Sequence, residues 1–331
     1  MLRSMDSAVA GLRAHQNKMD VIGHNLANVN TFGFKAQTYT FKEAMYQTSS
    51  ASTGGTTDAG GSNAAQYGYG TLMGTIGVDM TASTPSYVGG LNATINGEGF
   101  FMTSAKKVVD VERNDALKTA EPDWDYTRVG QFSVDSQGYL VDGNGNFIYG
   151  FYPGTKNFDA NGKLLAGAKL SPLRIPTSIG GTGTDKDPYV PVFGVNDGDK
   201  AMKATSVSIN KMGQITATLT NDADATTDAG KSFPGVNIGT VAIVTFQNPE
   251  GLTKAGETYY KANDEDNSGR ADASVPGGDM ATLMSGYIEA SNVDLAKEFA
   301  EMIMTQRGFQ ANSKMITVSD EMLSELVNMK R

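Results

Sequence analysis

Residues 2–30 read LRSMDSAVAGLRAHQNKMDVIGHNLANVN, and this stretch decides the fold. Its mostly apolar residues recur at alternating steps of three and four, which is the period of a helical seam. The same period returns near the other end of the chain, from residue 295 to residue 327. A lone amphipathic helix cannot bury such a stripe in water, so we expect the terminal helices to pack on each other and on the same helices of neighbouring copies.

We assign the apolar residues of both rows to assembly. Ser291 is the predicted N-cap of the last helix, since its side-chain oxygen can accept a hydrogen bond from an unpaired amide of the first turn. We expect the first helix to run from Leu2 to about Asn30 and the last from Asn292 to about Met329. The assembly residues are Leu2, Met5, Val9, Leu12, Met19, Ile22 and Leu26 in the first helix, and Ser291, Asn292, Val293, Leu295, Phe299, Met302, Phe309, Ile316, Leu323 and Val327 in the last.

The middle of the chain reads as a turn-rich β domain. The chain has 331 residues, 39% hydrophobic content and 39 glycines, which is enough for a folded core and indicates many tight turns. Two-residue alternation before turn signals, in 132–134 and 207–209, is typical of antiparallel hairpins. Residues 241–246, VAIVTF, predict a central strand covered on both faces. The predicted class is α+β, with N- and C-terminal α-helices paired as a coiled coil and a mainly antiparallel β domain between them.

The predicted domains follow these changes of period. Residues 34–46 could form a strand or a half-turn of helix, and residues 48–66 have too little apolar surface to order alone. Trp124 could be a surface anchor or a core residue. The domains are 1–32, the N-terminal helix; 33–75, a linker or extended arm; 76–285, an outer β domain with polar insertions at 106–125 and 153–202; and 286–331, the C-terminal helix.

Composition and spacing argue against several functions. The net charge is -9 and basic clusters are absent, so we expect no nucleic-acid partner. No apolar run is long enough to predict membrane insertion. Cysteine is absent, and the two histidines, His15 and His24, lie half a turn out of phase on the first helix, so we expect no metal, no cofactor and no Ser-His-Asp triad in the β domain. Residues 264–269 imitate half of a calcium loop, but Val275 stands where its glutamate belongs, and a solvated turn is the better interpretation.

Residues 24–35, HNLANVNTFGFK, resemble the signature of bacterial flagellar rod and hook proteins, in which an Asn-x-x-Asn pair, a threonine and Gly-Phe-Lys close the N-terminal helix. Residues 289–295, EASNVDL, and 306–310, QRGFQ, resemble the matching C-terminal motif, and residues 126–134 and 248–252 resemble core strands of the family's β domain. The signature residues are Asn25, Ala27, Asn28, Thr31, Gly33, Phe34 and Lys35.

The resemblance implies a structural subunit and no enzyme. Its terminal helices would form an inner tube around an axial channel, and its partners would be further copies in a helical homopolymer, flagellar rod and hook-filament junction proteins, and a hook cap during assembly. It implies an extracellular place in the flagellar hook or basal body, reached through the type III export gate without a cleaved signal peptide. Phe41 and Met45 resemble the short export-gate motif, although packing of both at the helix-to-sheet junction explains them equally well.

Within this family, residues 299–303 and 325–331 look most like Gram-positive-type hook proteins. We therefore favour a hook subunit, part of a flexible curved tube that transmits torque from rod to filament in motility. Chain length and the segment 48–66 leave a distal rod protein, part of a rigid drive shaft, as the alternative. A glycan-binding or glycan-active β-rich surface protein is the second alternative.

Overall fold

The structure is a computed structural model that falls into two compact units. The helical unit comprises Met1–Asn30, Lys35–Asp79 and Val293–Arg331, and the β unit comprises Thr31–Phe34 and Met80–Asn292. The structure describes residues 2–55, 60–112, 123–153, 157–158, 164–165, 167–175, 202–221, 232–263, 266–269, 271–277 and 280–329.

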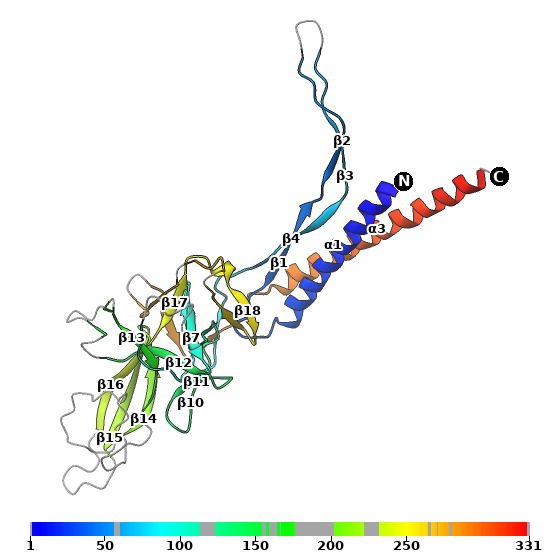
Figure 1. The fold of residues 1–331 in the computed structure, drawn as a ribbon. Helices are drawn as coiled ribbons and strands as arrows, with labels where there is room; N and C mark the ends of the chain where they lie inside the picture. The colour runs from blue at the N-terminus through cyan, green and yellow to red at the C-terminus, as the bar shows by residue number, and fades with distance from the viewer. Residues whose placement is uncertain are drawn as a thin grey trace. The chain divides into compact units, whose positions relative to one another are not determined.

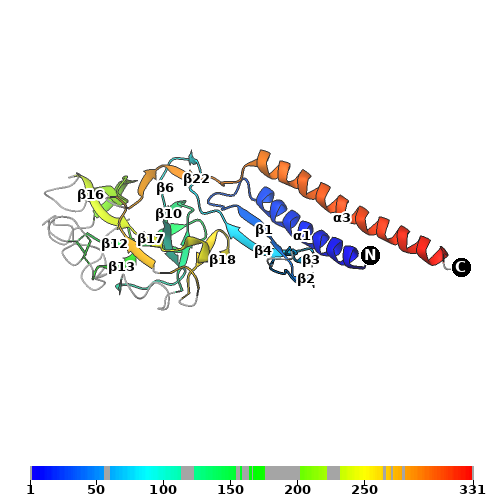
Figure 2. The same ribbon diagram turned by 90° about the horizontal axis from the view of Figure 1, so that it is seen from above.

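Two antiparallel helices run side by side in the helical unit, α1 (Leu2–Ala27) and α3 (Leu295–Met329), as Figures 1 and 2 show. The last turn of α1 meets the first turn of α3, where the Asn25 amide donates a hydrogen bond of 3.0 Å to Glu298. Nearer the other end, Gly11 lies against Asn312. Because α3 has 35 residues and α1 has 26, the C-terminal end of α3 extends past the start of α1.

A long two-stranded ribbon completes the helical unit (Figure 1). Strand β1 (Gln37–Glu43) pairs with β4 (Thr71–Val78), and β2 (Tyr46–Ser50) pairs with β3 (Ala65–Gly68), all antiparallel. Residues 37–43, within the stretch that the sequence left open, are therefore strand. The ribbon packs on α1 near its base, where the rings of Phe41 and His15 meet edge to face at 5.4 Å.

The β unit is built on one large antiparallel sheet, with fourteen strands among the described residues. Its main path runs β14-β15-β16-β12-β7-β9-β19-β18, and two further pairs, β6 with β21 and β5 with β22, stand apart from it. The strands are β5 (Pro85–Tyr87), β6 (Ala93–Asn96), β7 (Phe100–Ser104), β8 (Val111–Glu112), β9 (Asp125–Thr127), β10 (Phe132–Val134), β11 (Leu140–Asp142), β12 (Phe147–Phe151), β13 (Lys169–Pro172), β14 (Met202–Ile209), β15 (Gln214–Asn221), β16 (Ser232–Val241), β17 (Ile243–Phe246), β18 (Thr253–Gly256), β19 (Tyr259–Lys261), β20 (Ala271–Ser274), β21 (Thr282–Ser285) and β22 (Tyr287–Glu289), with a 3-10 turn, η1, at Pro249–Gly251.

Both faces of the central strands are covered by apolar side chains. In β7, Phe100 and Met102 belong to one core cluster, while Phe101 between them belongs to the other. Strand β17 divides in the same way, with Val244 in the first cluster and Ile243 in the second. Successive side chains of a strand point to opposite faces, so the two clusters lie on the two sides of the sheet.

The predicted central strand at 241–246 is wrong in one respect. Five of the six residues are buried and Thr245 is half-buried. However, β16 ends at Val241 and β17 begins at Ile243, so the chain changes partner at Ala242. Strand β16 pairs with β12 and β15, whereas β17 pairs with β7 and β20. The apolar run therefore belongs to two strands of one sheet.

Parts of the two predicted insertions belong to the main core. Most of both segments lies outside the described residues. Within the described parts, however, β13 pairs with β12 and β8, and Leu170 and Leu173 are fully buried. Trp124, which the sequence left undecided, is buried and packs edge to face on Tyr149 at 4.7 Å. It is a core residue.

The last helix starts later than the sequence suggests, and Ser291 is not its N-cap. Helix α3 begins at Leu295, and the carboxylate of Asp294 accepts hydrogen bonds from the amides of Ala296 and Lys297 at 2.9 and 3.3 Å. Asp294 is therefore the cap, and its negative charge also suits the positive end of the helix dipole. The backbone oxygen of Ser291 instead accepts a hydrogen bond from the hydroxyl of Ser83 at 2.8 Å.

Candidate functional site

Helices α1 and α3 meet through small and polar residues. A Cβ atom placed on Gly308 would lie 2.6 Å from the ring of His15, and one on Gly11 would lie 2.7 Å from the side chain of Asn312. Ala14 is also buried in α1. The two glycines let the backbones come close, and Gly308 is the glycine of the QRGFQ motif.

The predicted stripes are therefore only partly covered within one chain. In α3 the exposed fractions are 43% for Leu295, 49% for Phe299 and 67% for Val327. The stripe positions stay a prediction about contacts between copies. In α1, Met5, Leu12, Met19 and Leu26 are half-buried, Val9 is exposed and Ile22 is buried, and the side chain of Leu2 lies outside the described residues; in α3, Phe309 is also exposed, Met302, Ile316 and Leu323 are half-buried, and Ser291, Asn292 and Val293 before the helix are half-buried.

Asn25 joins three elements of the helical unit. Its side chain is 1% exposed, and its amide nitrogen donates to the backbone oxygen of Gln37 at 2.8 Å and to Glu298 at 3.0 Å. Its oxygen accepts from the Gln37 amide at 2.9 Å. Burial raises the pKa of Glu298, whereas the hydrogen bond from Asn25 lowers it. An asparagine is needed here because the site requires both donors and an acceptor on one short side chain.

The rest of the signature closes the helix and makes the turn that follows it. Helix α1 ends at Ala27, earlier than expected, and the side chain of Asn28 donates to the backbone oxygen of His24 at 3.0 Å, which satisfies one carbonyl of the last turn. In the β unit, Gly33 has φ +68, and a Cβ there would lie 2.6 Å from Val129. Only glycine suits this position. Of the remaining signature residues, Phe34 and Lys35 are buried, and Ala27 and Thr31 lie at the surface or half-buried.

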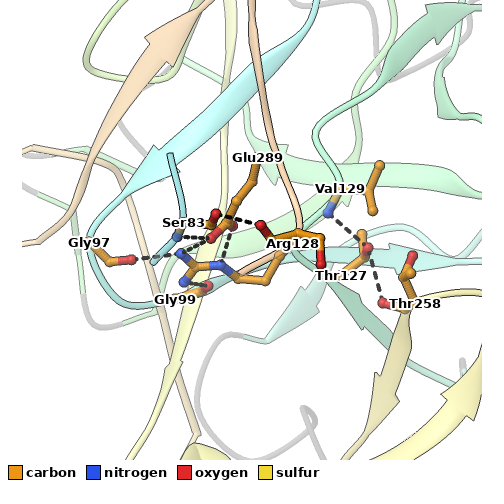
Figure 3. A network of polar contacts seen from close by, with 9 residues as sticks. Ser83, Gly97, Gly99, Thr127, Arg128, Val129, Thr258 and Glu289 are labelled. Carbon is orange, nitrogen blue, oxygen red and sulfur yellow. Dashed lines mark hydrogen bonds and ion pairs between the residues drawn. The ribbon is translucent and has the colours of Figure 1, made fainter. Parts of the chain in front are cut away.

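The β unit contains a buried ion pair between Arg128 and Glu289 (Figure 3). Their exposed fractions are 2% and 1%, and the guanidinium contacts both carboxylate oxygens, at 2.8 and 3.3 Å. Arg128 also donates to the backbone oxygens of Gly99 and Gly97, at 2.9 and 3.0 Å. The amide of Ser83 donates to Glu289 at 2.9 Å. The network therefore offers each charge several partners, as a buried pair requires.

This network, which we call the clamp, lies where the chain enters and leaves the β unit. The amide of Gly33, on the incoming segment, donates to the backbone oxygen of Glu289 at 2.8 Å. The hydroxyl of Ser83 donates to Ser291 on the outgoing segment at 2.8 Å. The clamp thus ties the segment Thr31–Phe34 and both ends of the segment Met80–Asn292 to the same buried charges.

The sequence did not reveal the clamp. Arg128 and Glu289 are 161 residues apart, and each stands alone beside apolar residues. A single charge in an otherwise apolar stretch is the available signal, and it does not say which opposite charge is the partner. Two further acceptors of Arg128 are the backbone oxygens of Gly97 and Gly99, and backbone acceptors leave no signal in the sequence.

The described residues contain a cavity but no grouping of metal-ligating side chains. No group of three or more metal-ligating side chains is found among them. A cavity of about 300 Å³ in the β unit includes Asp142, Asn144 and Tyr259, but the carboxylate of Asp142 is occupied by the amides of Asn144 and Asn146 and by the Tyr259 hydroxyl. Burial, followed by the hydrogen bond to Asp142, raises the pKa of Tyr259. These groups stabilise a turn.

Three other residues singled out in the sequence, His15, Phe41 and Met45, belong to the helical unit. His15 of α1 lies against Gly308 of α3 and contacts Phe41 of the ribbon. Burial lowers the pKa of His15, and the positive charge of Lys18 lowers it further. Phe41 is 42% exposed and contacts His15, but Met45 is 78% exposed, so packing does not account for it. No helix in the described part of the chain is long and apolar enough to cross a membrane.

Comparison with known proteins identifies the class of this chain. Residues 5–35 match the family described as flagella basal body rod protein, residues 116–217 match the flagellar hook protein FlgE/F/G D1 domain, and residues 284–329 match the flagellar basal body rod FlgEFG protein C-terminal. These segments come from both ends and the middle of the chain. They define a flagellar axial protein.

Among individual relatives, the flagellar basal-body rod protein FlgG of Bacillus subtilis is 37% identical over 334 residues, covering 100% of both chains. The flagellar hook protein FlgE of Borreliella burgdorferi is 26% identical over 460 residues, again covering 100% of both. The solved hook protein FlgE2 of Helicobacter pylori superposes on 30% of this chain and 22% of that chain with 25% identity and a TM-score of 0.21, which is too low for the folds to be compared. The chain belongs to the family of flagellar rod and hook proteins, which are structural proteins and not enzymes.

Proposed function

We propose that this chain is a rod-type subunit that polymerises into the axial structure of the bacterial flagellum. The observation that carries the proposal is the apolar surface left open on the terminal helices, above all on α3, where Phe299, Ile303 and Val327 are 49%, 59% and 67% exposed. Monomeric proteins rarely leave such surfaces uncovered, and further copies of the chain are the partners that cover them. Polar positions between these residues would then face a hydrated channel.

The preference for rod over hook departs from the expectation drawn from the sequence. The Bacillus subtilis rod protein aligns with this chain end to end in 334 positions, whereas the Borreliella burgdorferi hook protein needs 460 positions for the same 331 residues. Hook relatives of that kind therefore contain long segments that this chain lacks. The ribbon of strands β1 to β4 does not separate the two candidates, since an arm between helix and sheet is a feature of distal rods as well as of some hooks.

A hook subunit is the second candidate. Two hook relatives also cover 100% of this chain, at 26% and 27% identity, and methionines on the exposed part of α3, such as Met304 and Met322, would tolerate sliding between copies. The two candidates differ in place and mechanics. A rod should be straight and lie within the cell envelope, and a hook should be curved and lie outside it.

The deciding experiment places the protein on the flagellum. Antibody or gold label on isolated basal bodies should mark the shaft inside the outermost envelope layer, and purified polymers should be straight in electron micrographs. Label on a curved segment outside that layer would favour the hook. Deletion of residues 1–30 should abolish assembly in either case, because it removes α1.

We also propose that the chain is exported unfolded without loss of its N-terminus and that Phe41 and Met45 contribute to recognition at the export gate. The support is the 78% exposure of Met45, which leaves it without a packing role in the helical unit. Met45→Ala should reduce secretion without lowering the thermal stability of the folded chain. Secretion at the level of the unchanged protein would contradict this assignment.

A further inference from the structure

Three asparagines of the chain are followed directly by glycine, and two of these pairs lie in the part that the structure describes. They are Asn96-Gly97 and Asn144-Gly145, and the third, at 161–162, lies outside it. In such a pair the amide nitrogen of the glycine can attack the side-chain carbonyl carbon of the asparagine, because glycine has no side chain to shield it. Both pairs have the same intrinsic chemistry, so a difference in their reactivity comes from the fold.

The first pair lies at the end of a strand. Asn96 is the exposed last residue of β6, a four-residue strand in a two-stranded sheet, and it pairs with Thr282. Within the described residues, neither the side chain of Asn96 nor the amide of Gly97 makes a hydrogen bond. Arg128 holds the carbonyl of Gly97, which belongs to the next peptide group. The peptide group that must rotate for the attack therefore lies just past the last strand pair, where a short two-stranded sheet opens readily.

The second pair is held by hydrogen bonds. The side-chain amide of Asn144 donates to Glu257 at 3.1 Å and to the hydroxyl of Tyr259 at 3.0 Å. The amide of Gly145, which would be the attacking group, donates to the backbone oxygen of Asp142 at 3.1 Å. These bonds must break before the reaction, and each of them raises its barrier.

We propose that Asn96 is a self-modification site, at which the folded chain converts asparagine to aspartate and isoaspartate. The amide nitrogen of Gly97 bonds to the side-chain carbonyl carbon of Asn96, and the bond from that carbon to the side-chain nitrogen breaks. The proton of the Gly97 amide leaves with the side-chain nitrogen as ammonia, and a cyclic succinimide remains. Water then opens the ring at either carbonyl carbon, which gives aspartate or isoaspartate. The reaction needs water and no oxidant or reductant.

The modification acts on the clamp. The backbone oxygen of Gly97, directly after the modified residue, accepts a hydrogen bond from Arg128 at 3.0 Å. Isoaspartate routes the main chain through the side-chain carbon and so lengthens the backbone between residues 96 and 97. The carbonyl of Gly97 then moves relative to a guanidinium that is 2% exposed, and a hydrogen bond weakens steeply when its geometry changes. The clamp therefore loses an acceptor as the protein ages, whether the chain forms a rod or a hook.

Peptide mapping of the full, folded chain by mass spectrometry tests the site. During incubation at mildly alkaline pH in water enriched in heavy oxygen, labelled aspartate and isoaspartate should accumulate at position 96 at least about ten times faster than at position 144. In urea, where the fold is lost, both positions should react at similar rates. Equal rates in the folded chain, or product at position 96 only in urea, would overturn the proposal.

Two variants separate the reaction from its structural effect. Asn96→Gln keeps the amide but disfavours ring closure, so its Trp124 fluorescence midpoint in urea should be the same before and after incubation, while that of the unchanged chain falls. Glu257→Ala removes an acceptor of the Asn144 amide and should speed the reaction at position 144 but not at position 96. An unchanged midpoint in the aged natural chain would refute the effect on the clamp, and an unchanged rate at position 144 would refute protection by hydrogen bonds.

Discussion

Replacing Arg128 by methionine should destabilise the β unit by about 3–5 kcal/mol, because it removes one partner of a buried ion pair. Glu289 is 1% exposed, and both of its carboxylate oxygens would lose a hydrogen bond from the guanidinium. The backbone oxygens of Gly97 and Gly99 would lose their donor as well. Methionine fills much of the volume of arginine, so the loss would report the charge and the hydrogen bonds more than a cavity.

The single tryptophan of the chain provides the assay. Trp124 is buried in the β unit, whereas both long helices belong to the helical unit. Fluorescence therefore follows one unit, and circular dichroism at 222 nm follows mainly the other. With a urea dependence of about 2–3 kcal/mol per molar, the Arg128→Met midpoint in fluorescence should fall by roughly 1–2.5 M.

A matched control and a double variant make the test sharper. Lys261 forms an ion pair with Asp123 that is 35% and 74% exposed, so Lys261→Met should cost less than about 1 kcal/mol. Arg128→Met combined with Glu289→Met removes both buried charges and should be more stable than Arg128→Met alone. The reasoning is refuted if Arg128→Met costs no more than the Lys261 control, or if the double variant is less stable than the single one.

Three further predictions concern single positions. Gly308→Ala should destabilise the helical unit by about 1–2 kcal/mol in urea melts at 222 nm, because the new Cβ would lie 2.6 Å from His15. Gly23 has no atom within 4 Å of the place that a Cβ would take, so Gly23→Ala should instead stabilise the unit by up to about 1 kcal/mol. Equal effects of the two substitutions would show that close approach at Gly308 is unimportant. Gly33→Ala should lower the fluorescence midpoint, because it combines φ +68 with a 2.6 Å approach to Val129, and an unchanged midpoint would contradict this. Burial lowers the pKa of His15, so the folded chain binds that proton less firmly than the unfolded chain; helix stability should fall as the pH drops below about 6.5, and His15→Gln should weaken this dependence in melts at pH 7.5 and 5.

The helices could be predicted from the sequence because their period is a local property. Every turn of α1 and α3 repeats the pattern, and no distant residue is needed to recognise it. Which face of each helix meets the other could not be predicted in this way. Close approach at Gly11 and Gly308 selects a row of small and polar residues, and hydrophobicity alone points to a different face.

The clamp and the strand change at Ala242 were missed for another reason. Both depend on residues far apart in the chain, such as Arg128 with Glu289, or β16 and β17 with their different neighbours. An apolar run looks the same whether it belongs to one strand or two. The signature glycine at Gly33 was recognised by its motif, but its cause, a positive φ against Val129, is visible only in three dimensions.

The clamp has a consequence for how the β unit responds to a pulling force. The incoming segment is held at Gly33 and the outgoing segment at Ser291, and both are attached to the surroundings of Glu289. Tension on one of these two segments is therefore shared by the other. Because the ion pair at the centre of this attachment is excluded from water, dissolved salt screens it little. The resistance of the attachment to tension should therefore be nearly independent of ionic strength.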